Sequence, residues 1–164
     1  MFFITQICIF LQNKDHYNIN KLLKINLFKP LLIIMTKWPA FGRCKSRLSK
    51  DIGNKNALKI QEEMFLHTIK VAKSLEEKDF LEISLAIDGI GYKSCRRLVT
   101  KLGIKNFTLQ GKGVLGERMR RQLLVNFNNF FKHSKRPIIF IGTDLPELSQ
   151  LDLLEAISKI NDNN

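Results

Sequence analysis

The sequence predicts an α/β protein in which a mostly parallel β-sheet lies between two layers of helices. Short apolar runs of strand length recur along the chain, the clearest at 31–35, 81–87 and 137–141. Segments with the apolar spacing of helices separate these runs, and turns containing glycine, proline or aspartate divide the two kinds of segment. Because strands that alternate with helices usually pair in parallel, this order favours a three-layer α/β/α arrangement.

The individual elements follow from local signals. The apolar run Leu31–Met35 ends in a loop with proline and glycine, as a buried strand does. A later strand stops at the turn dipeptide Asp88-Gly89, and Gly103 ends the basic helix that follows. The predicted elements are a strand at 31–35, a helix at 56–75, a strand at 81–87, a helix at 93–102, a strand at 106–110, a helix at 115–131, a strand at 137–141 and a helix at 151–160.

Composition indicates one globular domain. The chain has 164 residues, of which 45% are hydrophobic and 26% charged, values that argue against wholesale disorder. Its three cysteines form no CxxC pair, which favours a reducing, cytoplasmic location over a disulfide framework or a zinc site. The apolar run at 2–11 is too short to span a bilayer and lacks the flanks of a signal peptide, so no membrane span is expected.

The formal net charge of +12 is concentrated in two stretches. Residues 1–60 and 93–136 carry net charges of +9 and +11, whereas 61–92 and 137–164 carry −4 each. Such blocked basic charge suits a phosphorylated partner, and a solvated basic surface is the alternative for many of these lysines. The charge also allows nucleic-acid binding, but that partner is not favoured because the aromatic residues fit core positions better than a stacking platform. Examples of such aromatic residues are Phe65, Phe127 and Phe140.

The loop at 36–48, after the first apolar run, is the strongest candidate for a binding site. Gly42 lets the backbone approach a ligand closely, and several cations surround it, so the loop suits an anionic phosphate. Cys44 is interpreted as a small loop residue rather than a nucleophile, because no histidine lies nearby in the sequence. The cations of this loop are Lys37, Arg43, Lys45 and Arg47.

Two further segments could carry a ligand. Asp144 directly follows an apolar strand, where a carboxylate could ligate Mg²⁺ or Mn²⁺; the alternative is a helix cap or an Asx turn. The glycines of 110–119 precede a helix, where free backbone N–H groups favour an anion; the alternative is a structural loop that enters the helix. The spacing of these glycines matches neither a P-loop nor a dinucleotide-binding motif.

Together these segments resemble the DUF2064 family of GT-A-like transferases. An apolar strand precedes T-K-x-P-x-x-G-x-x-K-[ST]-R-L at 36–48, a Q-G-x-G-x-L-G-E-R-M block occupies 110–119, and a strand ends in I-G-T-D-x-P at 141–146. The motifs have the order and similar separations of that family, whose members are often described as glycosyltransferases or selenodomain-associated transferases. The resemblance covers residues 30–164, so residues 1–29 are expected to be an N-terminal extension outside the domain.

The resemblance implies a nucleotide-diphospho-sugar transferase fold and a metal-dependent glycosyltransferase that uses a nucleotide-sugar donor. The alternatives are a nucleotidyltransferase of the guanylyltransferase type, which uses a nucleoside triphosphate, and a nucleotide-binding remnant without turnover. By the same resemblance, Asp144 would coordinate Mg²⁺ or Mn²⁺. The residues expected to bind the nucleotide phosphates or line their cleft are Lys37, Gly42, Lys45, Arg47, Glu117 and Arg118.

The chain also departs from the family pattern. Phe41 stands where a second proline is common, and Ser46 where threonine is common. Relatives continue past the last helix into a strand and a G-P-x-x-D-G-G-Y-like motif, which the sequence lacks after Asn161. The domain is therefore expected to be incomplete at its C-terminus, with the acceptor side of the pocket missing, so the family's activity does not automatically carry over to this chain.

Overall fold

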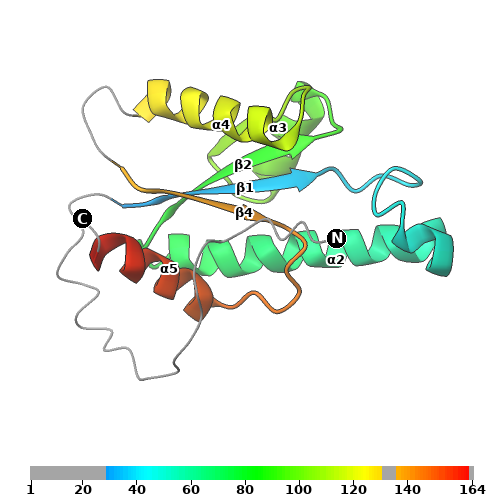
Figure 1. The fold of residues 1–164 in the computed structure, drawn as a ribbon, viewed down its shortest axis with the longest axis horizontal. Helices are drawn as coiled ribbons and strands as arrows, with labels where there is room; N and C mark the ends of the chain where they lie inside the picture. Colours follow the sequence, from blue (N-terminus) through cyan, green and yellow to red (C-terminus); the bar gives the residue numbers. More distant parts are fainter. Residues whose placement is uncertain (1–28, 131–135, 163–164) are drawn as a thin grey trace.

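A computed structural model describes residues 29–130 and 136–162, which form a four-stranded parallel sheet in the order β3-β2-β1-β4 (Figure 1). The strands are β1 (Leu31–Lys37), β2 (Glu82–Asp88), β3 (Asn106–Leu109) and β4 (Ile138–Gly142). The helices are α2 (Leu48–Glu76), α3 (Tyr92–Lys101), α4 (Leu115–Phe130) and α5 (Gln150–Asp162). Strands and helices alternate, as the sequence predicts.

Strand β1 lies at the centre of the sheet, between β2 and β4. Its first four residues, Leu31 to Ile34, are completely buried, because neighbouring strands take up its backbone hydrogen bonds and helices cover both of its faces. This double burial explains why the strand is a continuous apolar run rather than an alternating one. At the carboxyl end of the sheet, Lys37 of β1 pairs with Asp88 of β2, and Met35 pairs with Gly142 of β4.

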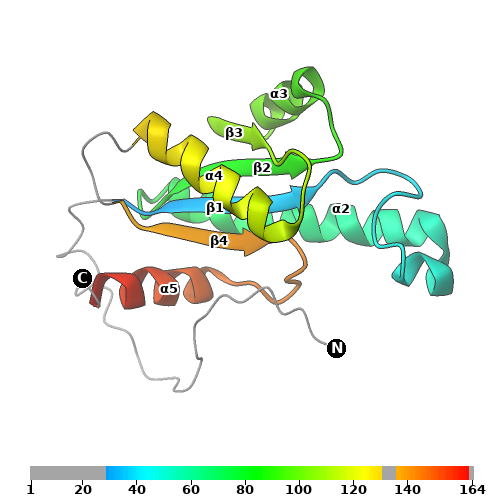
Figure 2. The same ribbon diagram turned by 45° about the horizontal axis from the view of Figure 1, so that its top comes forward.

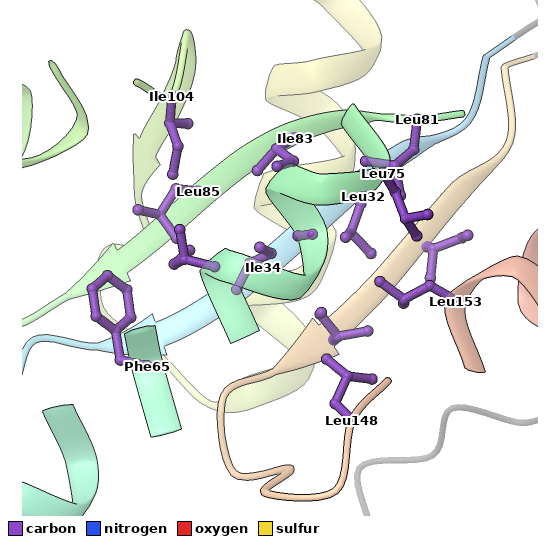
Figure 3. Packing of buried hydrophobic residues seen from close by; sticks show 14 of the residues in the cluster. Leu32, Ile34, Phe65, Leu75, Leu81, Ile83, Leu85, Ile104, Leu148 and Leu153 are labelled. Atoms are coloured by element: carbon purple, nitrogen blue, oxygen red, sulfur yellow. The ribbon is translucent and has the colours of Figure 1, made fainter. Parts of the chain in front are cut away.

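The larger core lies on one face of the sheet. There the side chains of alternate strand residues, such as Leu32, Ile34, Ile83 and Leu85, pack against apolar residues of α2, α3 and α5 (Figure 3). Buried residues from α2 and α5 alike, among them Leu75 and Leu153, belong to this one cluster. We conclude that α2 and α5 belong to the same layer of the molecule.

Helix α4 covers the opposite face of the sheet (Figures 1 and 2). The buried cluster on this side is small and contains Leu31, Ile33 and Ala86, with Met35 and Phe140 packed against it. Helix α4 itself contributes buried polar residues, Gln122 and Asn126, whereas Leu123 and Leu124 are exposed. The three-layer α/β/α prediction is therefore confirmed, with unequal layers.

Every predicted boundary except the start of α2 agrees with the structure within two residues, and the differences at β1 and α2 have a clear cause. Strand β1 continues through Thr36 to Lys37 because both residues stay in register with β2, so the loop after it is shorter than the sequence suggested. Helix α2 begins at Leu48 rather than at residue 56, with a break at Gly53, whose φ of 80° is left-handed. The predicted extension at 1–29 falls almost wholly outside the described residues, as do Phe131 and the side chain of Phe127.

Among the helices that the structure describes, none is both long and apolar enough to cross a membrane.

Candidate functional site

The carboxyl ends of the four parallel strands meet at one edge of the sheet, which is where ligands bind in open α/β folds. Strands β1 and β2 end in Lys37 and Asp88, and β3 is followed directly by Gln110. Strand β4 ends at Gly142 and leads into Thr143 and Asp144. Every motif that the sequence singles out therefore lies in a loop at this edge or next to it.

Gln110 connects the ends of β1 and β2. Its amide nitrogen Nε2 donates one hydrogen bond to the carbonyl of Thr36 and another to that of Ala86, each 2.9 Å long. The residue is 5% exposed, so water does not compete for these bonds. Gln110 is part of a sequence motif, but the sequence does not indicate its role. The available signal was an amide at the carboxyl end of the short strand predicted at 106–110.

A buried pair of hydroxyl groups connects β1 with the loop after β4. The Thr36 and Thr143 Oγ1 atoms lie 3.0 Å apart, and both residues are nearly inaccessible to solvent. Because Thr143 directly precedes Asp144, this contact holds the start of the β4–α5 loop against the end of β1. The position of the Asp144 backbone is thereby set by the sheet.

The structure brings Lys45 and Asp144 into contact. The Lys45 Nζ atom lies 3.1 Å from Asp144 Oδ1, and the Lys45 side chain is 16% exposed against 71% for Asp144. Lys45 has a left-handed backbone, with φ of 46°, which is uncommon for a residue with a side chain. The cationic loop is therefore held against the β4–α5 loop by an ion pair between two of the residues that the sequence predicts to form the site.

The other predicted cations of the loop are not held by ion pairs. Lys37, Arg43 and Arg47 are exposed, and none of them forms an ion pair with any residue that the structure describes. Gly42 has a φ of +70°, the conformation for which glycine is favoured. Cys44 is 3% exposed and its Sγ lies 3.4 Å from the carbonyl oxygen of Ala40. The interpretation of Cys44 as a small structural residue fits this burial, since a nucleophilic thiol needs access.

Glu117 and Arg118 take part in internal contacts of the loop before α4. The Glu117 carboxylate accepts a hydrogen bond of 3.1 Å from the backbone N–H of Val114, as the glutamate of a capping box does. Arg118 donates to the Asp88 carboxylate from Nη1 and to the Gly113 carbonyl from Nε, each at 2.8 Å. These side chains therefore shape the carboxyl edge between β2 and α4, and their contact with a nucleotide remains a prediction.

A cavity of about 220 Å³ opens between the ends of β1 and β4 and the start of α4. Its wall is mostly apolar, as in most ligand sites, and its polar residues are Thr36, Lys37 and Gln110. The residues that line it are Met35, Thr36, Lys37, Gln110, Leu115, Met119, Phe140, Ile141 and Gly142.

The arrangement of carboxylates bears on the predicted metal site. Within the described residues, no group of three histidine, cysteine, aspartate or glutamate side chains could hold a metal ion. Asp144 is paired with Lys45, and Asp88 is paired with Arg118. These residues do not fit a metal ion held by protein ligands alone. Mg²⁺ is commonly bound by one or two carboxylates together with substrate phosphates, and a lone Asp144 is compatible with that arrangement.

The fold has a solved counterpart. A crystal structure of a Desulfovibrio desulfuricans G20 protein, inferred to be a nucleotide-diphospho-sugar transferase, matches with a TM-score of 0.64 and 18% sequence identity. The match covers 84% of this chain and 55% of that one, so the chain spans about half the length of the solved structure. The three-layer architecture of this chain is thus shared with that protein.

The sequence itself identifies the family. The family model described as "Uncharacterized protein conserved in bacteria (DUF2064)" matches residues 71–164, more than half of the chain, and the chain belongs to this family. The matched region includes Glu117, Arg118 and Asp144, whereas β1 and the cationic loop precede it. Comparison with curated proteins gives no match.

Proposed function

We propose that this protein is a transferase whose carboxyl edge binds a nucleotide sugar and uses it as a glycosyl donor. The observation that carries the proposal is the contact between Lys45 and Asp144, which places an ammonium and a carboxylate side by side at the carboxyl edge of the sheet. A diphosphate needs cations around it, and the leaving group of glycosyl transfer needs its developing negative charge neutralised. The family membership and the fold of the solved counterpart support the same class of reaction.

In this proposal, the cationic loop, the cavity and Asp144 have different roles. Lys45 and the exposed cations of the loop, Arg47 among them, bind the diphosphate oxygens, while the left-handed turn at Gly42 lets backbone N–H groups approach them. The mostly apolar cavity beside Lys37 accepts an uncharged part of the donor. Asp144 would hold a divalent cation that comes with the donor, Mg²⁺ or Mn²⁺, and this cation would supply charge neutralisation at the leaving diphosphate.

A nucleotidyltransferase would use the same loop and carboxylate. The products that the protein releases therefore distinguish the two reactions. The purified chain is incubated with nucleotide sugars and, separately, with nucleoside triphosphates, each in the presence of Mg²⁺ or Mn²⁺. Release of a nucleoside diphosphate from the sugar donor supports glycosyl transfer, and release of pyrophosphate from the triphosphate supports nucleotidyl transfer. Binding without any product identifies a nucleotide-binding protein that does not turn over.

Binding is measured through Trp38, because it is the chain's one tryptophan and lies at the start of the cationic loop. We expect Lys45→Ala and Arg47→Ala each to weaken nucleotide binding about tenfold or more, since each removes a charge-assisted hydrogen bond. Lys105→Ala is the control, because Lys105 is exposed and precedes β3 at the opposite edge of the sheet. Absence of nucleotide binding in the wild-type chain, or equal loss in all three variants, would overturn the proposal.

A further inference from the structure

We infer that the ion pair between Lys45 and Asp144 makes this site selective for the divalent-cation complex of a diphosphate over either component alone. The inference rests on the proposed function, because it concerns the ligand of the same site. The Lys45 ammonium and the Asp144 carboxylate are both expected to contact the ligand. Each is already neutralised by the other, because Lys45 Nζ lies 3.1 Å from Asp144 Oδ1.

The pair is held in place by the scaffold around it. Asp144 follows Thr143, which is bonded to Thr36 of the central strand, and the carbonyl of Thr36 in turn accepts a bond from Gln110. The Lys45 side chain is largely buried, so its ammonium has few solvent-facing positions in which to move away from the carboxylate. The scaffold therefore holds the Asp144 backbone and the Lys45 ammonium in place, and the exposed Asp144 carboxylate contacts that ammonium at 3.1 Å.

A free divalent cation meets an obstacle at this pair. Its expected ligand, Asp144, carries the Lys45 ammonium, so the cation must approach a positive charge and displace it. No second carboxylate compensates, because Asp88 is held by Arg118 and the described residues contain no group of three ligating side chains. Weak binding of the cation alone follows.

A free diphosphate meets the opposite obstacle. The positive charge of Lys45 is already compensated, and an approaching phosphate is repelled by the Asp144 carboxylate. When cation and diphosphate arrive as one unit, the phosphate takes the place of the carboxylate at Lys45 while the cation takes the place of the ammonium at Asp144. One ion pair is then exchanged for two, and each half of the ligand removes the obstacle to the other.

This exchange predicts positive coupling between the two halves of the ligand, and coupling in binding is reciprocal. The test uses Mn²⁺, whose paramagnetism reports binding directly, and inorganic pyrophosphate, which avoids any choice of base or sugar. In the wild-type chain, we expect Mn²⁺ and pyrophosphate each to bind at least about fivefold more tightly when the other is present, the lower end of typical coupling. The affinity is corrected for formation of the Mn²⁺–pyrophosphate complex in solution.

Two variants remove one charge each. Lys45→Met keeps the length of the side chain without its charge, and should bind Mn²⁺ alone at least about fivefold more tightly than the wild type. Asp144→Asn keeps the shape of the side chain, and should bind metal-free pyrophosphate more tightly by a similar factor, in the presence of a chelator. Lys105→Met, at the opposite edge, should change neither affinity. Unfolding curves confirm that each variant is folded, and the two charge-removing variants test the idea independently.

The outcomes separate this inference from the proposed function. If Lys45→Met binds Mn²⁺ no better than the wild type and Asp144→Asn binds metal-free pyrophosphate no better, the pair is a structural contact and the inference fails, even where nucleotide sugars are bound. If neither nucleotide sugars nor nucleoside triphosphates bind, the proposed function fails. The Mn²⁺ measurement on Lys45→Met still decides whether the ammonium blocks the carboxylate.

Discussion

At the scale of single residues, the carboxyl edge is organised by side chains that hydrogen-bond to the backbone. Gln110 bridges β1 and β2, and Thr36 is bonded to Thr143 beside β4. Residues of this kind influence the site even where they contact no ligand. They determine how far apart the ends of neighbouring strands lie, and hence where Lys37 and Asp144 stand relative to each other.

Replacing Gln110 by methionine should destabilise the fold. The substitution preserves side-chain length but removes both donors, so the carbonyls of Thr36 and Ala86 lose buried partners. We expect a loss of about 2 kcal/mol in the free energy of unfolding, since each buried group left without a partner costs about 1–3 kcal/mol and local relaxation recovers part of it. Urea denaturation measures the change, with exposed Lys112→Met as the control. Equal midpoints for the two variants would contradict this role for Gln110.

At the scale of elements, the glycines between β3 and the first turn of α4 have different physical roles. Gly113 has a φ of +113°, and a Cβ placed there would lie 2.2 Å from the Glu117 Oε2 atom that caps the helix. Gly116 lies inside α4, and nothing stands within 4 Å of the position of its missing Cβ. One glycine is required by the loop, whereas the other only weakens the helix.

The same substitution at these glycines should therefore have opposite effects. Gly113→Ala should destabilise the protein by about 1–3 kcal/mol, because it strains the backbone and displaces the capping carboxylate. Gly116→Ala should stabilise it by about 0.5–1 kcal/mol, because alanine loses less conformational freedom in a helix. Thermal unfolding of the two variants side by side provides the measurement. A stabilising Gly113→Ala would show that the capping contact does not constrain this loop.

At the scale of the whole molecule, the excess of positive charge affects the stability of the folded protein. The formal net charge is +12, and the sequence pI is about 9.8. The positive charges in such a large excess repel one another, and this repulsion favours the more expanded unfolded chain. In most ion pairs that the structure describes, at least one side chain is more than a quarter exposed, so water screens the attraction and each pair contributes little.

Added salt should consequently stabilise the protein. Raising sodium chloride from about 20 mM to about 300 mM shortens the screening length from roughly 20 Å to below 10 Å, which weakens repulsion across the molecule. We expect the midpoint of thermal unfolding to rise by a few degrees. Potassium chloride at equal ionic strength should act alike, since screening does not depend on which of these cations is used. A midpoint that falls with salt would mean that attractive ion pairs outweigh the net repulsion.

Much of the fold could be predicted from the sequence because its signals are local. The run Leu31–Met35 and the turn at Asp88-Gly89 carry their own periodicity and turn chemistry, and the structure places strands there. The start of α2 could not be predicted in this way, since Gly53 interrupts the helical pattern and the helical turn before it has no clear periodicity. Strand β1 extends to Lys37 for a similar reason, because its last residues are polar and are held by pairing with β2.

The sequence by itself determined the alternation of elements, the family, and the loops in which charged residues gather, because each of these depends on residues close together in the chain. Only the tertiary structure decided which charges meet. Lys45 and Asp144 are 99 positions apart, and Arg118 and Asp88 are 30 apart. Their pairing follows from the order β3-β2-β1-β4, which places the loop after β1 beside the loop after β4 and the segment after β3 beside the end of β2. Local patterns carry no information about that order, so a cationic loop and an aspartate became an ion pair only in the folded chain.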